Sequence, residues 1–141
     1  MINSAVGDLH NCWCGMFIEL DEEVHMVYSL DSATVNSCDD VSTCKTTCAS
    51  EFNTYTAGGD LNHVLGDGYS VGQEICLRMV ERHGIHNIYH ATVYGYGNVC
   101  NGPWVYDGVS SINSLCCHKG FYRPCEYYSL KKEKMDEKKN T

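Results

Sequence analysis

Cysteine side chains can react or bind a metal ion, and the chain of 141 residues contains ten of them. Zinc sites in small domains usually contain two cysteines separated by two residues, and that spacing does not occur here. An even set of cysteines without metal-site spacing is typical of disulfide-stapled proteins from oxidising compartments. We therefore predict five disulfides and a secreted protein. The predicted disulfide cysteines are Cys12, Cys14, Cys38, Cys44, Cys48, Cys76, Cys100, Cys116, Cys117 and Cys125.

The pairing of these cysteines stays open at the level of sequence. Only the neighbours Cys116 and Cys117 are constrained, because a ring between adjacent cysteines is strained, and we expect them to have different partners. Full oxidation would also remove the free thiol that a cysteine nucleophile needs. The adjacency of Cys117 and His118 is therefore not expected to be catalytic.

Histidines are the next candidates, and their spacing at His83, His86 and His90 resembles a set of metal ligands. Gly84 is expected to end a helix before His86. On a following strand, four rises of roughly 3.3 Å would separate His86 from His90 by about 13 Å, which is too far for one zinc ion. We therefore predict no zinc site and no cofactor. These histidines are expected at the surface.

Carboxylates suggest two further kinds of chemistry. An EF-hand loop beginning at Asp60 would need an oxygen ligand and a glycine where Val64 and Leu65 stand, so only a calcium loop of another type remains open. A small secreted hydrolase, such as a ribonuclease, would need an acid and a base. The residues that could supply these roles are His86, His90, Arg123 and Glu126, but no local motif specifies them. We predict that the protein is not an enzyme and keep the hydrolase as an alternative.

Tyrosine is the last unusual residue type, with ten copies against three phenylalanines. Tyrosine and tryptophan combine an apolar ring with a polar tip, which suits recognition surfaces, although the same rings can also pack a small core. We predict a partner-binding patch on one sheet face. Its residues are His86, His90, Tyr94, Trp104 and Tyr106.

Charge and hydropathy exclude several partners. The net charge is −8; residues 1–128 are acidic, whereas residues 129–141 are rich in lysine. An acidic body repels nucleic-acid phosphates and anionic membranes, and no apolar run approaches the ~20 residues of a membrane helix. We expect one domain over residues 1–128, a charged mobile tail over 129–141, and a secretory signal already removed before Met1. The protein is expected to be monomeric.

The elements that must position these residues follow from the periodicity of apolar side chains. We predict a hairpin over residues 16–30, with Met16, Ile18 and Leu20 inward from the first strand and Val24, Met26, Tyr28 and Leu30 inward from the second. Helices are predicted over 38–52 and 70–83, separated by a long loop. A strand over 85–94 is expected to bury Ile85, Asn87, Tyr89, Ala91 and Val93 and to expose His86, Ile88, His90, Thr92 and Tyr94.

This order predicts an α+β fold, a small disulfide-stapled antiparallel sheet with two helices packed on one face. A mostly-β disulfide domain, in which the 38–52 helix is missing, is the alternative. For function we predict a non-enzymatic binding module that acts on a partner protein, such as a receptor or host protein, in the broad class of toxins, defence proteins and pathogen effectors. An extracellular matrix protein is a further alternative.

Overall fold

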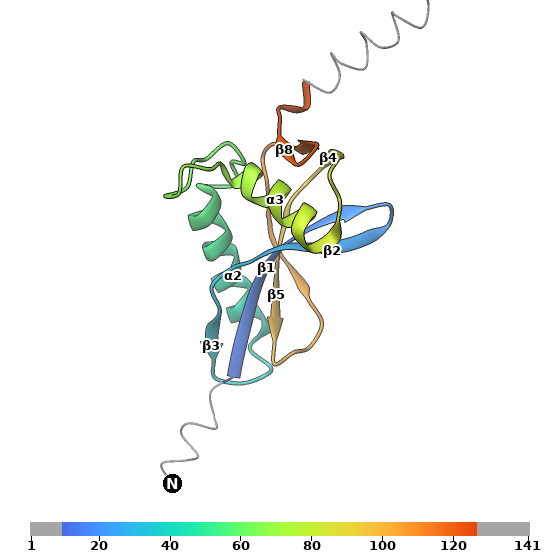
Figure 1. Cartoon of the computed structure of the whole chain (residues 1–141). Helices are drawn as coiled ribbons and strands as arrows, with labels where there is room; N and C mark the ends of the chain where they lie inside the picture. Colours follow the sequence, from blue (N-terminus) through green and yellow to red (C-terminus); the bar gives the residue numbers. More distant parts are fainter. Residues whose placement is uncertain (1–9, 127–141) are drawn as a thin grey trace, which may run out of the picture.

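The computed structural model of the chain describes residues 10–126, and within them the α+β fold class is confirmed (Figure 1). The predicted tail over 129–141 lies outside the described residues. The elements, in chain order, are β1 His10–Leu20, β2 Glu23–Ser29, β3 Ala33–Val35, α2 Val41–Thr56, α3 Val71–His83, β4 Ile88–Ala91, β5 Tyr94–Val99, β6 Val105–Ser110, β7 Leu115–His118 and β8 Phe121–Tyr122.

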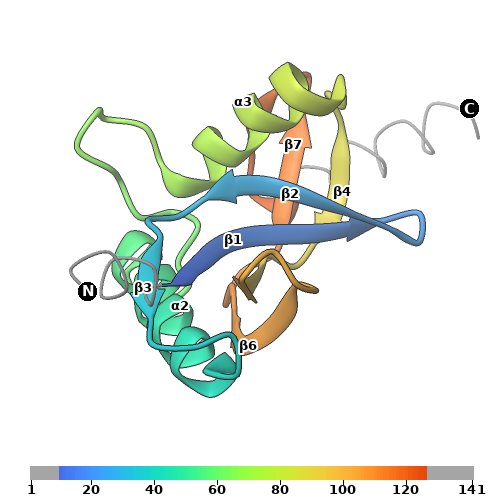
Figure 2. The ribbon, with the colours of Figure 1, turned by 90° about the horizontal axis from the view of Figure 1, so that it is seen from below.

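The strands form two antiparallel sheets where the sequence suggested one. Five strands pair in the order β2-β1-β5-β6, with β3 also paired to β1, and a smaller sheet has the order β4-β7-β8. Helix α2 contacts β1, β5 and β6 of the larger sheet, whereas α3 contacts β2 of that sheet and β7 and β8 of the smaller one (Figure 2). The apolar side chains of both helices and both sheets join in one core.

The predicted hairpin is confirmed as β1 and β2, joined at Asp21 and Glu22. Both turn residues have positive φ, 53° and 67°, the backbone that a tight two-residue hairpin turn requires. The face assigned to the second strand is partly wrong, because Val24 is 60% exposed and Val27 is fully buried. The register shift between Met16 and Phe17 explains this, since the bulge it marks changes the side to which the residues beyond it point.

Helix α2 exists, so the mostly-β alternative is wrong, and it covers the larger sheet with the predicted stripe of Cys44, Cys48 and Phe52. It begins at Val41 rather than at residue 38. The cause is a turn before the helix, in which the Asp40 carboxylate accepts hydrogen bonds from the backbone N–H groups of Asn36 and Ser37, each at 3.0 Å.

Helix α3 agrees closely with its prediction. The Ser70 hydroxyl accepts a hydrogen bond from the Gln73 N–H at 3.1 Å. The helix ends at His83, and Gly84 is its left-handed C-cap with a φ of 65°. The Gln73 side chain does not complete a capping box. It bonds instead to the Gly120 carbonyl and the Tyr122 N–H, so it fastens α3 to β8.

The single strand predicted over 85–94 is divided between the two sheets. Strand β4 has a register irregularity between Ile88 and Ala91, and the chain then crosses to β5 in the larger sheet. Three predicted orientations are therefore wrong: Ile88 is buried at 2% exposure, Tyr89 is 54% exposed, and Asn87 is exposed as well. A bulge of this kind reverses which residues face the core, and alternation alone does not reveal it.

All ten cysteines form disulfides, as predicted. The pairs are Cys12–Cys44, Cys14–Cys48, Cys38–Cys100, Cys76–Cys117 and Cys116–Cys125. The first two staple α2 to β1, and the neighbours Cys116 and Cys117 have different partners. No helix in the described part of the chain is both long and apolar enough to cross a membrane.

Candidate functional site

The two faces of the five-stranded sheet differ in chemistry. Gly97 of β5 faces α2, because a Cβ added there would lie 3.1 Å from the Cys48 sulfur. Alternation along the strand therefore turns Tyr94, Tyr96 and Asn98 to the opposite face. Their partners across the β1–β5 pair are Phe17, Gly15 and Trp13. We call the rings on this side the aromatic face: Trp13, Phe17, Tyr94, Tyr96, Trp104 and Tyr106.

Five rings of the aromatic face, all except Trp13, form one connected layer. Phe17 lies with its ring centroid 4.9 Å from those of both Tyr96 and Trp104. Tyr106 lies 5.7 Å from Tyr94 and 5.9 Å from Tyr96. These separations are typical of favourable aromatic pairs. The layer is therefore held by its own packing and does not depend on a helix above it.

Phe17 is the buried centre of this layer at 6% exposure, while Trp13, Trp104 and Tyr106 expose 38%, 37% and 42% of their surfaces. Gly15 allows the rings to lie directly on the backbone of β1. A Cβ at Gly15 would approach Phe17 to 3.2 Å and Trp104 to 3.6 Å. The arrangement presents large, ordered rings to solvent, with an apolar residue already packed beneath them.

A hollow of about 550 Å³ lies at one end of the aromatic face, lined by Trp13, Met26, Ser29, Asn98, Asn101, Gly102 and Trp104. Asn98 is only 7% exposed. Its side-chain N–H donates to the Gly102 carbonyl at 2.7 Å, which fixes the orientation of the amide. Its side-chain oxygen is buried and has no hydrogen-bond partner among the described residues. The wall contains no charged side chain.

The turn that closes this hollow is held by a disulfide. Cys100 and Asn101 both have positive φ, 55° and 58°, between β5 and β6. The Cys38–Cys100 bridge ties that turn to the segment before α2. The rim of the hollow is therefore anchored to the segment that leads into α2.

Of the five residues predicted for the binding patch, the structure brings three together. Tyr94, Trp104 and Tyr106 all belong to the aromatic face, and Tyr94 is partly exposed. His90 lies on β4 in the smaller sheet, with its ring 5.2 Å from Tyr89. His86 precedes β4, and its carbonyl accepts a hydrogen bond from the Gly120 N–H at 2.8 Å. The two histidines are exposed, but they are not part of this face.

Sequence reasoning missed Trp13, Phe17, Tyr96 and Asn98. A signal for them exists, because Cys12, Cys14, Met16 and Ile18 alternate with Trp13, Gly15 and Phe17. That alternation begins at residue 12, before the predicted start of the hairpin at residue 16. The Tyr94-Gly95-Tyr96-Gly97 run carries the same period on β5.

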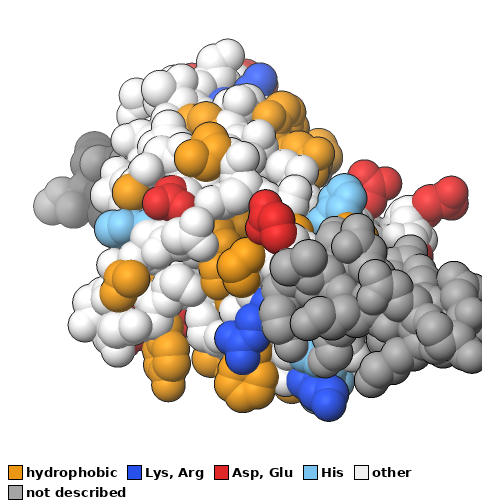
Figure 3. All heavy atoms as spheres, turned by 90° about the horizontal axis from the view of Figure 1, so that it is seen from above, with side chains coloured by type: hydrophobic (Ala, Val, Ile, Leu, Met, Phe, Trp, Pro, Cys, Tyr) orange, Lys and Arg blue, Asp and Glu red, His pale blue; other side chains and the backbone are white. Residues whose placement is uncertain are grey.

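The end of the molecule that carries β4 and β8 has a different surface. Figure 3 shows this end, and its hydrophobic side chains form several separate groups with acidic, basic and histidine side chains between them. Among residues 10–126, neither His86 nor His90 forms an ion pair with a carboxylate.

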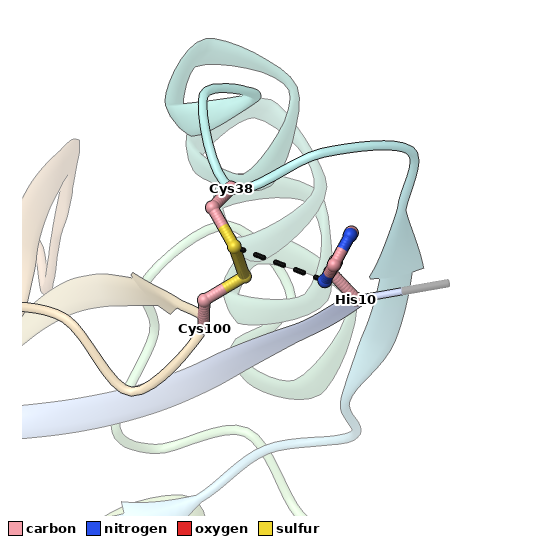
Figure 4. A group of neighbouring side chains, drawn as sticks. All are labelled: His10, Cys38 and Cys100. Atoms are coloured by element: carbon pink, nitrogen blue, oxygen red, sulfur yellow. Dashed lines mark hydrogen bonds between the residues drawn. A yellow bond between two sulfur atoms is a disulfide. The ribbon is translucent and has the colours of Figure 1, made fainter. Parts of the chain in front are cut away.

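One group of possible metal ligands combines His10 with Cys38 and Cys100 (Figure 4). The His10 Nδ1 atom lies 3.8 Å from the Cys38 sulfur. Both sulfurs belong to the same disulfide, whereas a zinc ligand must be a thiolate. In the oxidised protein this cluster therefore offers only one ligand, the imidazole.

Asp107 is a partly buried carboxyl on the α2 side of β6. It lines a hollow of about 370 Å³ with Ser42, Lys45, Thr46 and Ala49. One carboxyl oxygen accepts a hydrogen bond from the Val109 N–H at 3.1 Å, and the other has no partner among residues 10–126. Burial raises the pKa of Asp107, and the Val109 N–H and the Lys45 ammonium oppose that rise.

The described residues thus combine an oxidised scaffold with an exposed aromatic face. Comparison with known proteins adds no relative to this description: no family model, curated protein or solved structure matches the chain.

Proposed function

We propose that this chain is a secreted, non-enzymatic binding module that holds a basic partner protein on its aromatic face. The observation that carries the proposal is the ring layer itself, in which Trp13, Trp104 and Tyr106 are exposed over a buried Phe17. Large aromatic side chains are the residues that most often dominate the binding energy of protein interfaces. A preformed layer also reduces the entropy that must be lost on binding.

The charge of the chain indicates the chemistry of the partner. Residues 10–126 contain fourteen acidic and five basic residues. Such a charge excess attracts positively charged proteins and repels nucleic acids. Five disulfides are compatible with an extracellular setting. Toxins, defence proteins and pathogen effectors are among the extracellular classes that use small disulfide-stapled scaffolds to bind other proteins, and we propose that the chain belongs to one of them.

The two alternatives make different demands. A hydrolase such as a ribonuclease would need His86 or His90 beside a carboxylate and an arginine, and it would lose activity in the His90→Ala variant. A matrix protein would bind calcium through its acidic surface without depending on the rings. The aromatic face serves neither of these roles, which favours the binding module.

The proposal predicts that binding depends on Tyr94 and Tyr106. A displayed library of random peptides is selected on the wild-type protein, and the affinity of the selected clones is measured against variants. We expect Tyr94→Ala and Tyr106→Ala each to weaken binding by about tenfold, because truncating a central interface aromatic costs at least 1–2 kcal/mol. The selected clones should also be rich in lysine and arginine.

Two matched controls test whether the effect belongs to this face. Tyr69→Ala removes a tyrosine that is 51% exposed in the loop before α3, and His90→Ala changes the smaller sheet. Both should bind as the wild type does. Clones that bind the Tyr94 and Tyr106 variants with wild-type affinity would show that the aromatic face is not the binding site.

A further inference from the structure

We infer that the hollow between Trp13 and Trp104 receives an arginine side chain of the partner. This inference rests on the proposed binding function and specifies which chemical group the partner inserts. The relevant observations are an unmet buried acceptor, two aromatic walls, and an acidic chain.

Asn98 supplies the directional element. Its side-chain oxygen is buried without a hydrogen-bond partner among the described residues, and the amide cannot turn because its N–H donates to the Gly102 carbonyl. Buried polar atoms in folded proteins are nearly always paired, and Asn98 belongs to the wall of the hollow. A ligand that enters there can pair the oxygen by displacing the side chains that cover it. The missing partner must be a hydrogen-bond donor. A guanidinium carries only donors.

The two tryptophans supply the second element. A cation over the face of an indole is attracted by the ring quadrupole, and arginine is the cation most often found there. Elsewhere in this chain the same contact is made internally, with Arg78 4.8 Å from the Tyr28 ring centroid and Arg123 5.4 Å from that of Phe121. The hollow has no arginine or lysine of its own in its wall. A cation of the partner could therefore stack on Trp13 or Trp104 without competing with a side chain of this chain.

Other ligands fit this hollow less well. An anion would meet an acidic chain and an acceptor oxygen, both of which repel it. A neutral sugar could stack on the indoles, but it brings acceptors as well as donors, and the buried unmet atom is an acceptor only. An aliphatic side chain would leave the Asn98 oxygen unpaired. The guanidinium alone can both donate a hydrogen bond to the Asn98 oxygen and stack on an indole ring.

The tryptophans also provide the measurement. The chain contains two, and both line this hollow, so intrinsic tryptophan fluorescence reports on the site alone. The full-length protein is titrated with acetyl-Gly-Arg-Gly-amide and with the same peptide carrying citrulline, the neutral isostere of arginine. We expect a saturable change with the arginine peptide, and roughly tenfold weaker binding of the citrulline peptide, since the cation–π attraction is lost.

Separate variants test the two tryptophans and the Asn98 acceptor. Trp13→Leu keeps Trp104 as the reporter, Trp104→Leu keeps Trp13, and Asn98→Ala removes the acceptor. Each should weaken the arginine peptide about fivefold to tenfold, while the matched control Tyr69→Leu changes nothing. Near-ultraviolet circular dichroism identifies a variant that has lost its fold. If a variant has lost its fold, the inference is decided by comparing the affinities of the wild-type protein for the arginine and citrulline peptides.

Equal affinity for the arginine and citrulline peptides would overturn the inference. So would a fluorescence change produced by chitotriose and not by the arginine peptide, which would assign the hollow to a neutral sugar. Neither outcome affects the Tyr94 and Tyr106 measurements, which use the other end of the aromatic face. If the Tyr94 and Tyr106 variants bind the selected clones with wild-type affinity while the arginine peptide still binds, the hollow is a cation site but the proposed partner interface is wrong.

Discussion

At the scale of single residues, the least expected feature is the carboxyl of Asp107. One of its oxygens has no hydrogen-bond partner in the described part of the chain, and Gly95 is needed to make room for it. A Cβ at Gly95 would lie 2.6 Å from an Asp107 carboxyl oxygen. The site keeps an acidic group close to α2, where an ionised form is poorly solvated. This arrangement has a consequence for stability.

Replacing Asp107 with asparagine should stabilise the protein at neutral pH. Burial raises the folded-state pKa of Asp107 above its ordinary value of 3.8. The protonated form is therefore favoured by folding, and this contribution is lost as the pH rises from the ordinary value through the raised one. Asp107→Asn avoids the loss and should raise the free energy of unfolding at pH 7 by about 1 kcal/mol at most, since Asp107 is only half buried.

Thermal unfolding as a function of pH checks this prediction. The gain from Asp107→Asn should shrink as the pH falls through the raised pKa towards 3.8, and it should be absent well below 3.8, where the wild-type carboxyl is protonated in both states. Asp39→Asn, at an exposed carboxyl before α2, is the matched control and should leave the free energy of unfolding at pH 7 nearly unchanged. A variant that is less stable than the wild type at pH 7 would mean that the attraction between Asp107 and Lys45 outweighs desolvation.

At the scale of elements, the contact between α3 and β8 depends on one glycine. A Cβ at Gly72 would lie 2.5 Å from the ring of Tyr122. The Tyr122 hydroxyl donates to the Asn62 side chain at 2.9 Å, and its backbone N–H donates to Gln73 at 3.0 Å. The ring is therefore fixed at its backbone and at its tip. It has little freedom to move away from a larger residue.

Gly72→Ala should consequently destabilise the protein, although alanine is the better helix former. Overpacking of this kind typically costs about 1–3 kcal/mol, more than the gain of about 1 kcal/mol in helix propensity. Gly66→Ala is the matched control, because a Cβ there meets nothing within 4 Å and should leave stability nearly unchanged. Denaturant unfolding measures both. An unchanged midpoint for Gly72→Ala would show that β8 separates easily from α3.

The same elements show how far the sequence could be interpreted. The α3 limits and the inward cysteines of α2 were predictable, because a cap, a stop and a helical period are local signals. The orientations of Val24, Ile88 and Tyr89 were not, since a bulge arises from pairing with another strand. The aromatic face was predicted in part for a related reason. Tyr94, Trp104 and Tyr106 stood out by type, but only the pairing of β1 with β5 adds Trp13 and Phe17 to them.

At the scale of the whole molecule, the five disulfides divide into two groups. Cys12–Cys44, Cys14–Cys48 and Cys38–Cys100 hold α2 and the segment before it to the larger sheet, beneath the aromatic face. Cys76–Cys117 and Cys116–Cys125 hold α3 and the end of the described chain to the smaller sheet. The aromatic face and the end that carries His90 are thus stabilised by different bridges.

These bridges should be reduced in a defined order. Thiol–disulfide exchange needs access of the attacking thiolate to a sulfur, and Cys38 is exposed while Cys100 is partly buried. The cysteines of Cys12–Cys44, Cys14–Cys48 and Cys76–Cys117 are at most 1% exposed. Under limited dithiothreitol followed by alkylation, mass spectrometry should find Cys38 and Cys100 labelled before these six buried cysteines. Early labelling of Cys12 or Cys44 would mean that the core opens before the surface bridge reacts.

Loss of this one bridge also has a functional consequence that separates the two ends of the aromatic face. The Cys38–Cys100 disulfide anchors the Cys100–Asn101 turn, which forms the rim of the Trp13–Trp104 hollow. Tyr94 and Tyr106 are held by the β5–β6 pairing and by each other. The protein in which only Cys38–Cys100 is reduced should therefore lose affinity for the arginine peptide. In that same protein, Tyr106→Ala should still weaken the binding of the selected peptide clones. Equal loss of both would show that the bridge stabilises the whole sheet and not the rim alone.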